Sequence, residues 1–184
     1  MITTATDWVL DVERAYAAAY KQPVTTRGPA SLRALAAAGA VASRYLAVGT
    51  PRSFALVGDD PAIAISLEAH RAWFEPRELR CTSDAVAAAV GGRVVSLAEA
   101  LAADIVCMHA PMQLVASSLR RGTHVNALAR CELDDDLEHV AKLFDEPRGL
   151  PALAAGIVDG RELDELTIFE AGDAAVASAC LGSR

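Results

Sequence analysis

The sequence is poor in aromatic residues and in positive charge, and both deficits bear on its partners. Phe, Trp and Tyr make up only 5% of its 184 residues, and 24 acidic residues outnumber 17 basic ones, for a formal net charge of −7. A general nucleic-acid binder needs clustered basic residues and often an aromatic stacking platform. The composition therefore predicts no nucleic-acid partner.

Long apolar stretches and paired cysteines are also missing. No apolar stretch approaches the roughly 20 residues that a spanning helix needs. The first residues show no basic segment followed by an apolar one, as a secretory signal would. The cysteines Cys81, Cys107, Cys131 and Cys180 form no C-x-x-C pair, which is typical of reduced, buried thiols rather than of zinc ligands. We therefore expect a cytoplasmic protein with no membrane segment and no structural metal.

Short β-type segments alternate with helical ones along the chain, of which 53% is hydrophobic. Strands are predicted over residues 53–58, 78–82, 93–96, 104–108, 123–128 and 139–144. Helices are predicted over residues 7–20, 31–47, 61–74, 84–90, 97–102, 132–138 and 163–181. This alternation implies right-handed βαβ units and a mostly parallel sheet flanked by helices. The predicted fold class is therefore α/β of the Rossmann type, with a helical extension before Pro51.

The segment LVGDDPAIAISLEA resembles the strand, turn and helix of a dinucleotide-binding unit. In a G-x-G-x-x-G turn, glycines let backbone N–H groups approach a pyrophosphate at a helix N-terminus. Gly58 fits the first position, but Asp60 takes the second and Ile63 the third. Two unit charges about 4 Å apart repel by roughly 4 kcal/mol at an effective dielectric of 20, so a carboxylate here opposes a phosphate. Helix capping by Asp59 or Asp60 is the favoured interpretation, and a variant cofactor turn is the alternative.

Three further candidates follow later strands. Ser83 and Asp84 lie where a cofactor ribose commonly meets an acidic residue, although a helix cap at Asp84 is the favoured interpretation. His109 follows the fourth predicted strand, at the edge where ligand sites form, and is a weak candidate for a base or a ligand contact. A partly exposed loop histidine is the favoured interpretation of His109. The acidic run over 132–138 is more typical of a solvated helix start than of a cation site, so no metal ligands are predicted.

Several motifs, in this order, resemble the ornithine cyclodeaminase and mu-crystallin family. The stretch ASRYLA…PRSFALVGDDPAIAISLEAHRAWFEPRELR is similar to the family's small-residue helix, cofactor strand and following LEA. Similar to later family segments are SLAEALAADIVCMHA, LRRGTHVNALA, ELDDDLEHVAKLFDE and DGRELDELTIFEAGDAAVASA. The resemblance implies a Rossmann domain, a second domain for substrate and dimer contacts, and NAD(P)-linked imine or amine chemistry.

Departures from that family bear on activity. The family loop with a catalytic aspartate normally follows HVNALA, but here RCELDD follows at once, and Asp134 matches the next helix instead. Asn126 is retained, either as a weak catalytic candidate or as a residue that satisfies backbone groups. The family's substrate domain is larger than residues 1–50, which are predicted to be its helical remnant beside a Rossmann-like domain over 51–184.

These departures favour a binding or scaffold protein that has lost the family's catalysis and acts through another protein, with no cofactor expected. The alternative is an NAD(P)-dependent enzyme of the cyclodeaminase, ketimine reductase or amino-acid dehydrogenase type. The apolar face of helix 7–20, which includes Trp8, Val12 and Tyr16, is predicted to join a second chain, in a homodimer or with a partner protein. Folding of this helix back onto its own sheet is the alternative.

Overall fold

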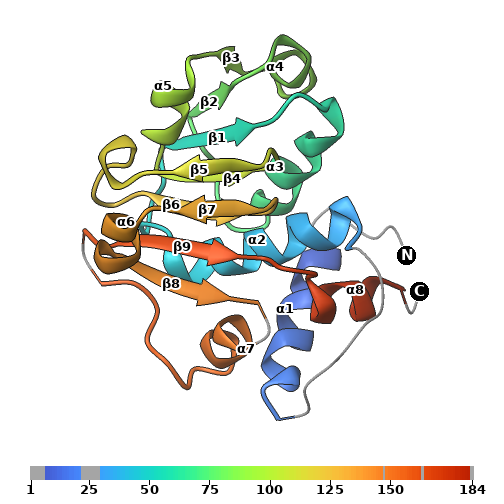
Figure 1. The fold of residues 1–184 in the computed structure, drawn as a ribbon. Coiled ribbons are helices and arrows are strands. Elements are labelled where there is room, and N and C mark those ends of the chain that lie inside the picture. Colours follow the sequence, from blue (N-terminus) through green and yellow to red (C-terminus); the bar gives the residue numbers. More distant parts are fainter. Residues whose placement is uncertain (1–6, 22–29, 147, 163, 183–184) are drawn as a thin grey trace.

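A seven-stranded parallel sheet forms the centre of the structure, a computed structural model that describes residues 7–21, 30–146, 148–162 and 164–182 (Figure 1). In sheet order the strands are β3 (Arg93–Val94), β2 (Glu78–Cys81), β1 (Ser53–Val57), β4 (Ile105–Met108), β6 (His124–Ala127), β9 (Leu166–Glu170) and β8 (Ala141–Asp145). Every pairing is parallel. The predicted α/β fold with a parallel sheet is confirmed.

Helices cover both faces of this sheet. One face carries α1 (Asp7–Ala19), α2 (Leu32–Leu46), α3 (Ile65–His70), α4 (Asp84–Val90), α7 (Gly149–Ala154) and α8 (Ala175–Gly182). The other carries α5 (Leu97–Leu101), α6 (Asp135–Val140) and a small parallel sheet of β5 (Met112–Leu114) and β7 (Cys131–Leu133). Strand alternation divides the core in this way: Phe54 and Leu56 of β1 pack on the first face, and Ala55 and Val57 on the second. None of the described helices is long and apolar enough to cross a membrane.

The order of the strands reverses beside β1. Successive crossovers lead from β1 outward through β2 to β3, and then back to β4 on the opposite side of β1. At such a point the loops that leave two neighbouring strands run in opposite directions and open a crevice at the carboxyl edge of the sheet. This crevice is where ligands bind in open α/β sheets.

Helix α2 lies unusually close to the sheet because small residues line it. A Cβ atom at Gly39 would stand 3.1 Å from the Leu128 Cδ2 atom and 3.3 Å from the Asn126 Cγ atom. Such distances require one of the neighbours to shift. The alanines that surround Gly39 on α2 are fully buried, among them Ala36, Ala37, Ala38 and Ala40. The alanine-rich sequence of this helix is therefore a packing requirement of the sheet below it.

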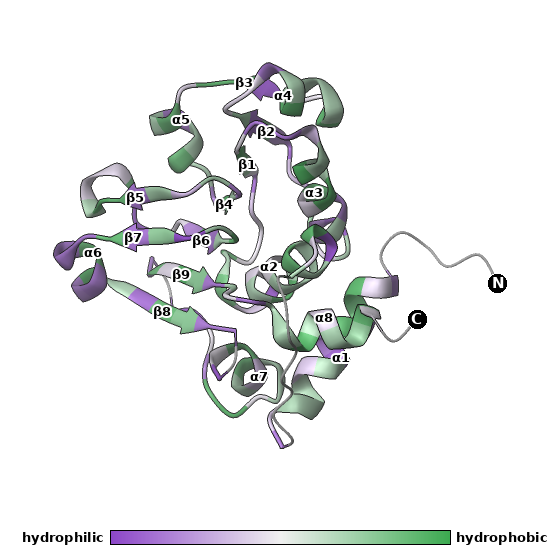
Figure 2. Cartoon of the chain, turned by 45° about the vertical axis from the view of Figure 1, so that its right-hand side comes forward, coloured by the Kyte–Doolittle hydropathy of each residue, from purple (hydrophilic) through white to green (hydrophobic). Residues whose placement is uncertain are grey.

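Helix α1 folds back onto its own chain, between α7 and α8 (Figures 1 and 2). Trp8, Val9, Val12 and Tyr16 are at most 3% exposed within the single chain. Because α7 and α8 of the same chain already cover this apolar face, the prediction that it joins a second chain is corrected. The helix does fold back, as the alternative had it, but onto other helices rather than onto the sheet. Tyr20, just beyond the end of α1, is 45% exposed.

The single helix predicted over 163–181 is wrong. Its first half contains β9, which lies between β6 and β8 inside the sheet. The sequence LTIFE is short, apolar and rich in β-branched and aromatic residues, and such a run packs as a buried parallel strand. Gly172, with φ of +55°, then separates β9 from α8. The structure also contains β5, β7 and α7, which were not predicted. The strand predicted over 139–144 begins at Ala141, because the residues before it complete α6.

Candidate functional site

The turn after β1 is built around Gly58. Its φ is +148°, a conformation that residues with a side chain rarely adopt. A Cβ atom here would stand 3.1 Å from Ile63 Cδ1 and 3.4 Å from His109 Cβ. The Gly58 N–H group donates to Thr82 Oγ1 at 3.1 Å. Thr82 follows β2 and was missed by the sequence analysis, because its role depends on the pairing of β1 with β2.

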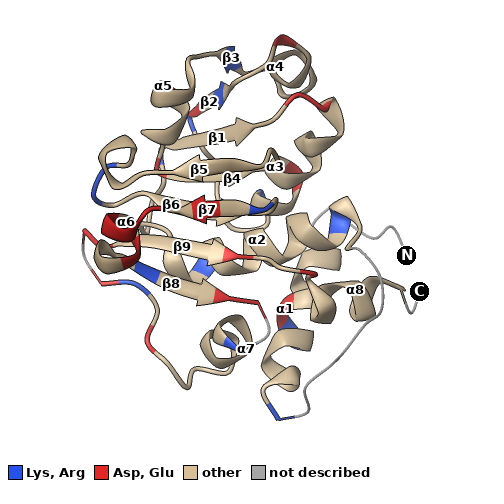
Figure 3. Ribbon diagram, in the orientation of Figure 1, with Lys and Arg blue, Asp and Glu red and all other residues tan. Residues whose placement is uncertain are grey.

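Asp60 caps the helix that follows this turn. Its Oδ1 atom accepts a hydrogen bond of 2.9 Å from the Ala62 N–H group, and Pro61 begins a short 3₁₀ helix, η1 (Pro61–Ala64), that continues into α3. The predicted cap is therefore present, on a 3₁₀ turn rather than a full α-helix. Asp59 and Asp60 are both exposed, and Figure 3 shows them as an acidic segment directly after β1. The negative charge that opposes a phosphate remains at this edge.

His109 lies directly beside that turn, with its Cβ atom 3.4 Å from the place of a Cβ atom at Gly58. Its Nε2 atom lies 2.8 Å from the Ser66 Oγ atom on α3, and its backbone N–H group donates to the Val57 carbonyl at 2.8 Å. Burial lowers the pKa of His109 to about 4, although the Asp60 carboxylate acts in the opposite direction. The imidazole is therefore neutral near pH 7 and can donate from one nitrogen and accept at the other.

Ser83 and Asp84 also lie at this edge, after β2. The Ser83 side chain accepts from the Val86 N–H group at 3.4 Å, so that Ser83 is the cap of α4. The prediction of Asp84 as the cap is corrected by one residue: Asp84 is the first residue of the helix and is exposed. The structure thus brings Gly58, Asp59, Asp60, Ser83, Asp84 and His109 to the carboxyl ends of β1, β2 and β4.

Asn126 does not reach this edge. It lies inside β6 with no exposed surface. Its Nδ2 atom donates to Ser43 Oγ at 2.8 Å, and its Oδ1 atom lies 3.1 Å from His124 Nε2. The backbone-satisfying role that sequence analysis offered as the alternative is replaced by a side-chain network. Asn126 therefore joins α2 to β6 and does not contact solvent.

Histidine His70 completes this buried network. Its Nδ1 atom lies 2.6 Å from the Ser66 carbonyl oxygen, which only accepts, so Nδ1 carries the hydrogen. Its Nε2 atom consequently accepts from the Ser43 hydroxyl at 2.8 Å. Burial lowers the pKa of His70 to about 4 and the pKa of His124 to about 3. Both rings are therefore neutral components of the core.

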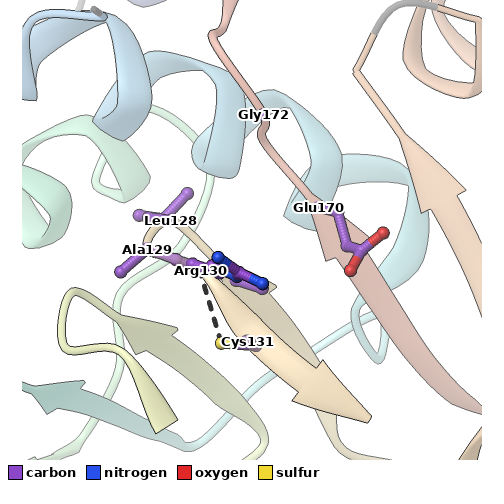
Figure 4. Close-up of a pocket in the computed structure, with 7 residues that line it drawn as sticks. Leu128, Ala129, Arg130, Cys131, Glu170 and Gly172 are labelled. Carbon is purple, nitrogen blue, oxygen red and sulfur yellow. Dashed lines mark hydrogen bonds between the residues drawn. The ribbon is translucent and has the colours of Figure 1, made fainter.

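A pocket of about 330 Å³ opens at the carboxyl ends of β6 and β9 (Figure 4). It is lined by Ala127, Leu128, Ala129, Arg130, Cys131, Glu170 and Gly172. Burial, followed in size by the charge of Glu170, raises the pKa of the Cys131 thiol to about 11, which keeps the thiol protonated and unreactive near neutral pH. Sequence analysis did not single out Arg130 and did not connect it with Glu170, because the two residues are far apart in the chain and no motif links them.

Metal binding finds no support in the described part of the chain. Within residues 7–21, 30–146, 148–162 and 164–182, no group of three or more His, Cys, Asp or Glu side chains is placed to hold a metal ion. The acidic run at the start of α6 instead contains the Asp134 cap, whose Oδ1 atom accepts from the Leu137 N–H group at 2.8 Å.

No protein-family model matches the chain, and no curated protein matches it significantly. Solved structures do resemble it. An archaeal alanine dehydrogenase dimer with bound NAD superposes with a TM-score of 0.68 at 24% identity, over 80% of this chain and 61% of that one. A Δ1-pyrroline-2-carboxylate reductase of Thermococcus litoralis, in complex with NADH and L-proline, gives 0.75 at 16% identity, over 98% and 92%. A probable ornithine cyclodeaminase from Bordetella pertussis Tohama I gives 0.65 at 22% identity, over 82% and 64%.

These structural neighbours belong to the ornithine cyclodeaminase and mu-crystallin family, and the resemblance predicted from the sequence is confirmed at the level of the fold. The chain spans less than two thirds of the alanine dehydrogenase and of the cyclodeaminase. At these identities the likeness establishes the Rossmann-type fold alone.

Proposed function

We propose that this protein binds a nicotinamide dinucleotide across the carboxyl edge of its sheet and uses it on a small amino or imino acid. The observation that carries the proposal is the alignment of three features along one edge: the Gly58 turn, the His109 side chain held by Ser66, and the pocket beyond β6 and β9. The neighbours solved with bound NAD or NADH favour this interpretation over a protein without a cofactor.

The residues at the carboxyl edge of the sheet differ in how well they would fit the parts of such a cofactor. Gly58 keeps the glycine backbone that a pyrophosphate approaches, and Asp84 is exposed beyond β2, where a ribose hydroxyl would be accepted. Asp60 is the poor fit, because its carboxylate takes the Ala62 N–H group that could otherwise donate to a phosphate. We therefore expect binding that is weaker than in an intact glycine-rich turn. When bound, the nicotinamide supplies or accepts hydride.

Among the described residues at this edge, His109 is the one best placed to exchange a proton. It stands beside Gly58, it is held at Nε2 by Ser66, and it is neutral near pH 7. Asn126 has no such role in the proposal, because it is fully buried. Proton transfer by a positioned group commonly contributes about 10²–10⁴-fold to a rate.

Calorimetric titration of the protein with NADH and NADPH at fixed salt tests the proposal. We expect saturable binding of at least one cofactor, and tighter binding by Asp60→Gly, because this change removes a carboxylate and leaves more space at the turn. Glu132→Gln, which removes an exposed carboxylate elsewhere, is the matched control and should leave affinity unchanged. Absence of binding by both the unmodified protein and Asp60→Gly contradicts the proposal.

A second candidate function is a binding role without catalysis, through a partner protein. The observation that favours it is the acidic cap at Asp60, which occupies the phosphate turn with a satisfied hydrogen bond. The same titration separates the two functions. Binding restored by Asp60→Gly but absent from the unmodified protein supports a cofactor fold that no longer holds a cofactor.

A further inference from the structure

A further cavity lies at the opposite edge of the sheet, where the chain enters β1 and β2. Its volume is about 340 Å³, and its lining includes Arg52, Trp73, Phe74, Glu75 and Arg77. These residues belong to the loop between α2 and β1 and to the loop between α3 and β2. This cavity, the amino-edge pocket, is therefore separated from the turn at the carboxyl edge by the length of β1.

Arg52 and Arg77 come side by side in the amino-edge pocket. The Arg77 N–H group donates to the Arg52 carbonyl at 2.8 Å, one place before Ser53 and Glu78, the first paired residues of β1 and β2. Among the residues that the structure describes, neither guanidinium takes part in an ion pair. Like charges that stand opposite each other on neighbouring strands repel, and an anion bound by both offsets that repulsion.

Trp73 gives the pocket a fixed aromatic surface. Its N–H group donates to the His70 carbonyl at 3.0 Å, at the end of α3. The Arg44 guanidinium carbon lies over the ring, 5.1 Å from its centre, and Arg44 is itself paired with Glu13. The other tryptophan of the chain, Trp8, is 3% exposed, whereas Trp73 is half-buried and lines a pocket. The ring is thus held in place, so that binding a ligand orders little of the protein.

We propose that the amino-edge pocket binds a nucleoside monophosphate. The base stacks on Trp73, and Arg52 and Arg77 bind the phosphate. Arginine binds phosphate through two parallel hydrogen bonds, and an aromatic side chain stacks on any base. Glu75, the one acidic residue in the lining, accepts from the ribose hydroxyls, as carboxylates commonly do in nucleotide sites.

The combination of side chains favours this class of ligand over simpler ones. Inorganic phosphate would use only the two arginines, and an uncharged aromatic compound would use only the ring. A volume of about 340 Å³ lies at the small end of ligand pockets, which suits a mononucleotide rather than a dinucleotide. Because the pocket lies at the opposite edge of the sheet from the proposed cofactor site, its ligand does not depend on the proposed function.

Calorimetric titration of the full chain compares AMP with adenosine, which lacks the phosphate, and with ribose 5-phosphate, which lacks the base. We expect AMP to bind at least about tenfold more tightly than either fragment, because hydrogen bonds to a charged group and a stacked base each contribute about this factor. AMP and adenosine should also quench the fluorescence of Trp73, whereas ribose 5-phosphate should not.

Variants assign the parts of the ligand to the side chains. Arg52→Gln and Arg77→Gln should each weaken AMP about tenfold and leave adenosine unchanged. Trp73→Leu should weaken AMP and adenosine by similar factors and abolish the quenching. Glu75→Ala should remove the preference for AMP over its 2′,3′-dideoxy analogue. Arg121→Gln removes an exposed arginine outside the pocket and is the matched control, and thermal melts of all five variants establish that the fold is kept.

Competition with NADH separates the amino-edge pocket from the cofactor site, because AMP is one half of NADH. AMP binding that persists at saturating NADH and is weakened by Arg52→Gln and Arg77→Gln supports the assignment. AMP that NADH displaces, with no effect of the two arginine variants, lies at the carboxyl edge and overturns it. Absence of AMP binding, or binding no tighter than that of ribose 5-phosphate, overturns it as well.

Discussion

The Tyr16 hydroxyl donates a hydrogen bond of 2.9 Å to Oε1 of Glu146, and both residues are fully buried. The same oxygen accepts from the Val176 N–H group at 3.0 Å, so the carboxyl group joins α1 to the first turn of α8. The other oxygen, Oε2, is buried without a hydrogen-bond partner. This contact fixes α1 to the rest of the chain at a position where helix packing alone would allow sliding.

Tyr16→Phe should destabilise the protein by about 1–3 kcal/mol, because it leaves a buried carboxyl group with one partner fewer. Urea denaturation followed by circular dichroism measures the loss. Tyr20→Phe is the control, since Tyr20 is 45% exposed and its hydroxyl can bond to water. Equal stability of the two variants would show that the Tyr16–Glu146 hydrogen bond contributes nothing.

Glu146 should make stability depend on pH in a direction unusual for a carboxyl group. Burial raises its pKa, although the Val176 and Tyr16 hydrogen bonds act against this shift. Its contribution is fully present below its ordinary pKa and is lost as the pH rises through the folded-state pKa. Glu146→Gln should therefore gain stability relative to the unmodified protein as the pH rises from 4.5 to 7. Urea midpoints at several pH values test this, and a constant difference between the two proteins contradicts it.

The buried histidines should act in the opposite direction. His70 has a pKa lowered by burial from 6.5 to about 4, so the unfolded chain binds more protons between these values. The free energy of unfolding should fall as the pH drops through this window, by roughly 3 kcal/mol for a shift of this size. His70→Gln should flatten that part of the profile. His139→Gln, at an exposed position, should leave the slope of the profile unchanged, and equal slopes in both variants would rule out His70 as the source.

Gly58→Ala should destabilise the protein by about 1–3 kcal/mol, because alanine is strained at a φ of +148° and its Cβ would press on Ile63 Cδ1 at 3.1 Å. Gly49→Ala is the matched control, since a Cβ atom there meets nothing within 4 Å. Thermal or urea unfolding of both variants gives the comparison. A loss at Gly49 as large as that at Gly58 would show that alanine substitution costs stability irrespective of the turn geometry.

Local signals in the sequence were sufficient to predict most strands of the sheet. β1 and β4 follow from short apolar runs, and α4 from the caps around 83–90, because such patterns depend on neighbouring residues alone. β9 was missed because its sequence, LTIFE, fits a buried strand and a buried helix segment equally well. Only its place between β6 and β8 decides the matter, and that place depends on residues about forty positions away.

The residues of the candidate site also differ in whether the local sequence is enough to identify them. Gly58, Asp60 and His109 were found because each directly follows or opens an element. Arg130 and Glu170 carry no local pattern, and they share a pocket only because β6 and β9 pair in a particular register. Asn126 was interpreted either as a weak catalytic candidate or as a residue that satisfies backbone groups, yet α2 packs directly over it and closes it from solvent.

The near-contact of Gly39 with Asn126 also has a kinetic consequence. Helix α2 cannot loosen without breaking the hydrogen bonds that join Ser43 to His70 and to Asn126. Backbone amides of α2 and of β6 should then exchange with deuterium through one common opening reaction, with the same dependence on denaturant. Two segments about ninety residues apart would thus behave as one cooperative unit that spans the predicted domain boundary near Pro51.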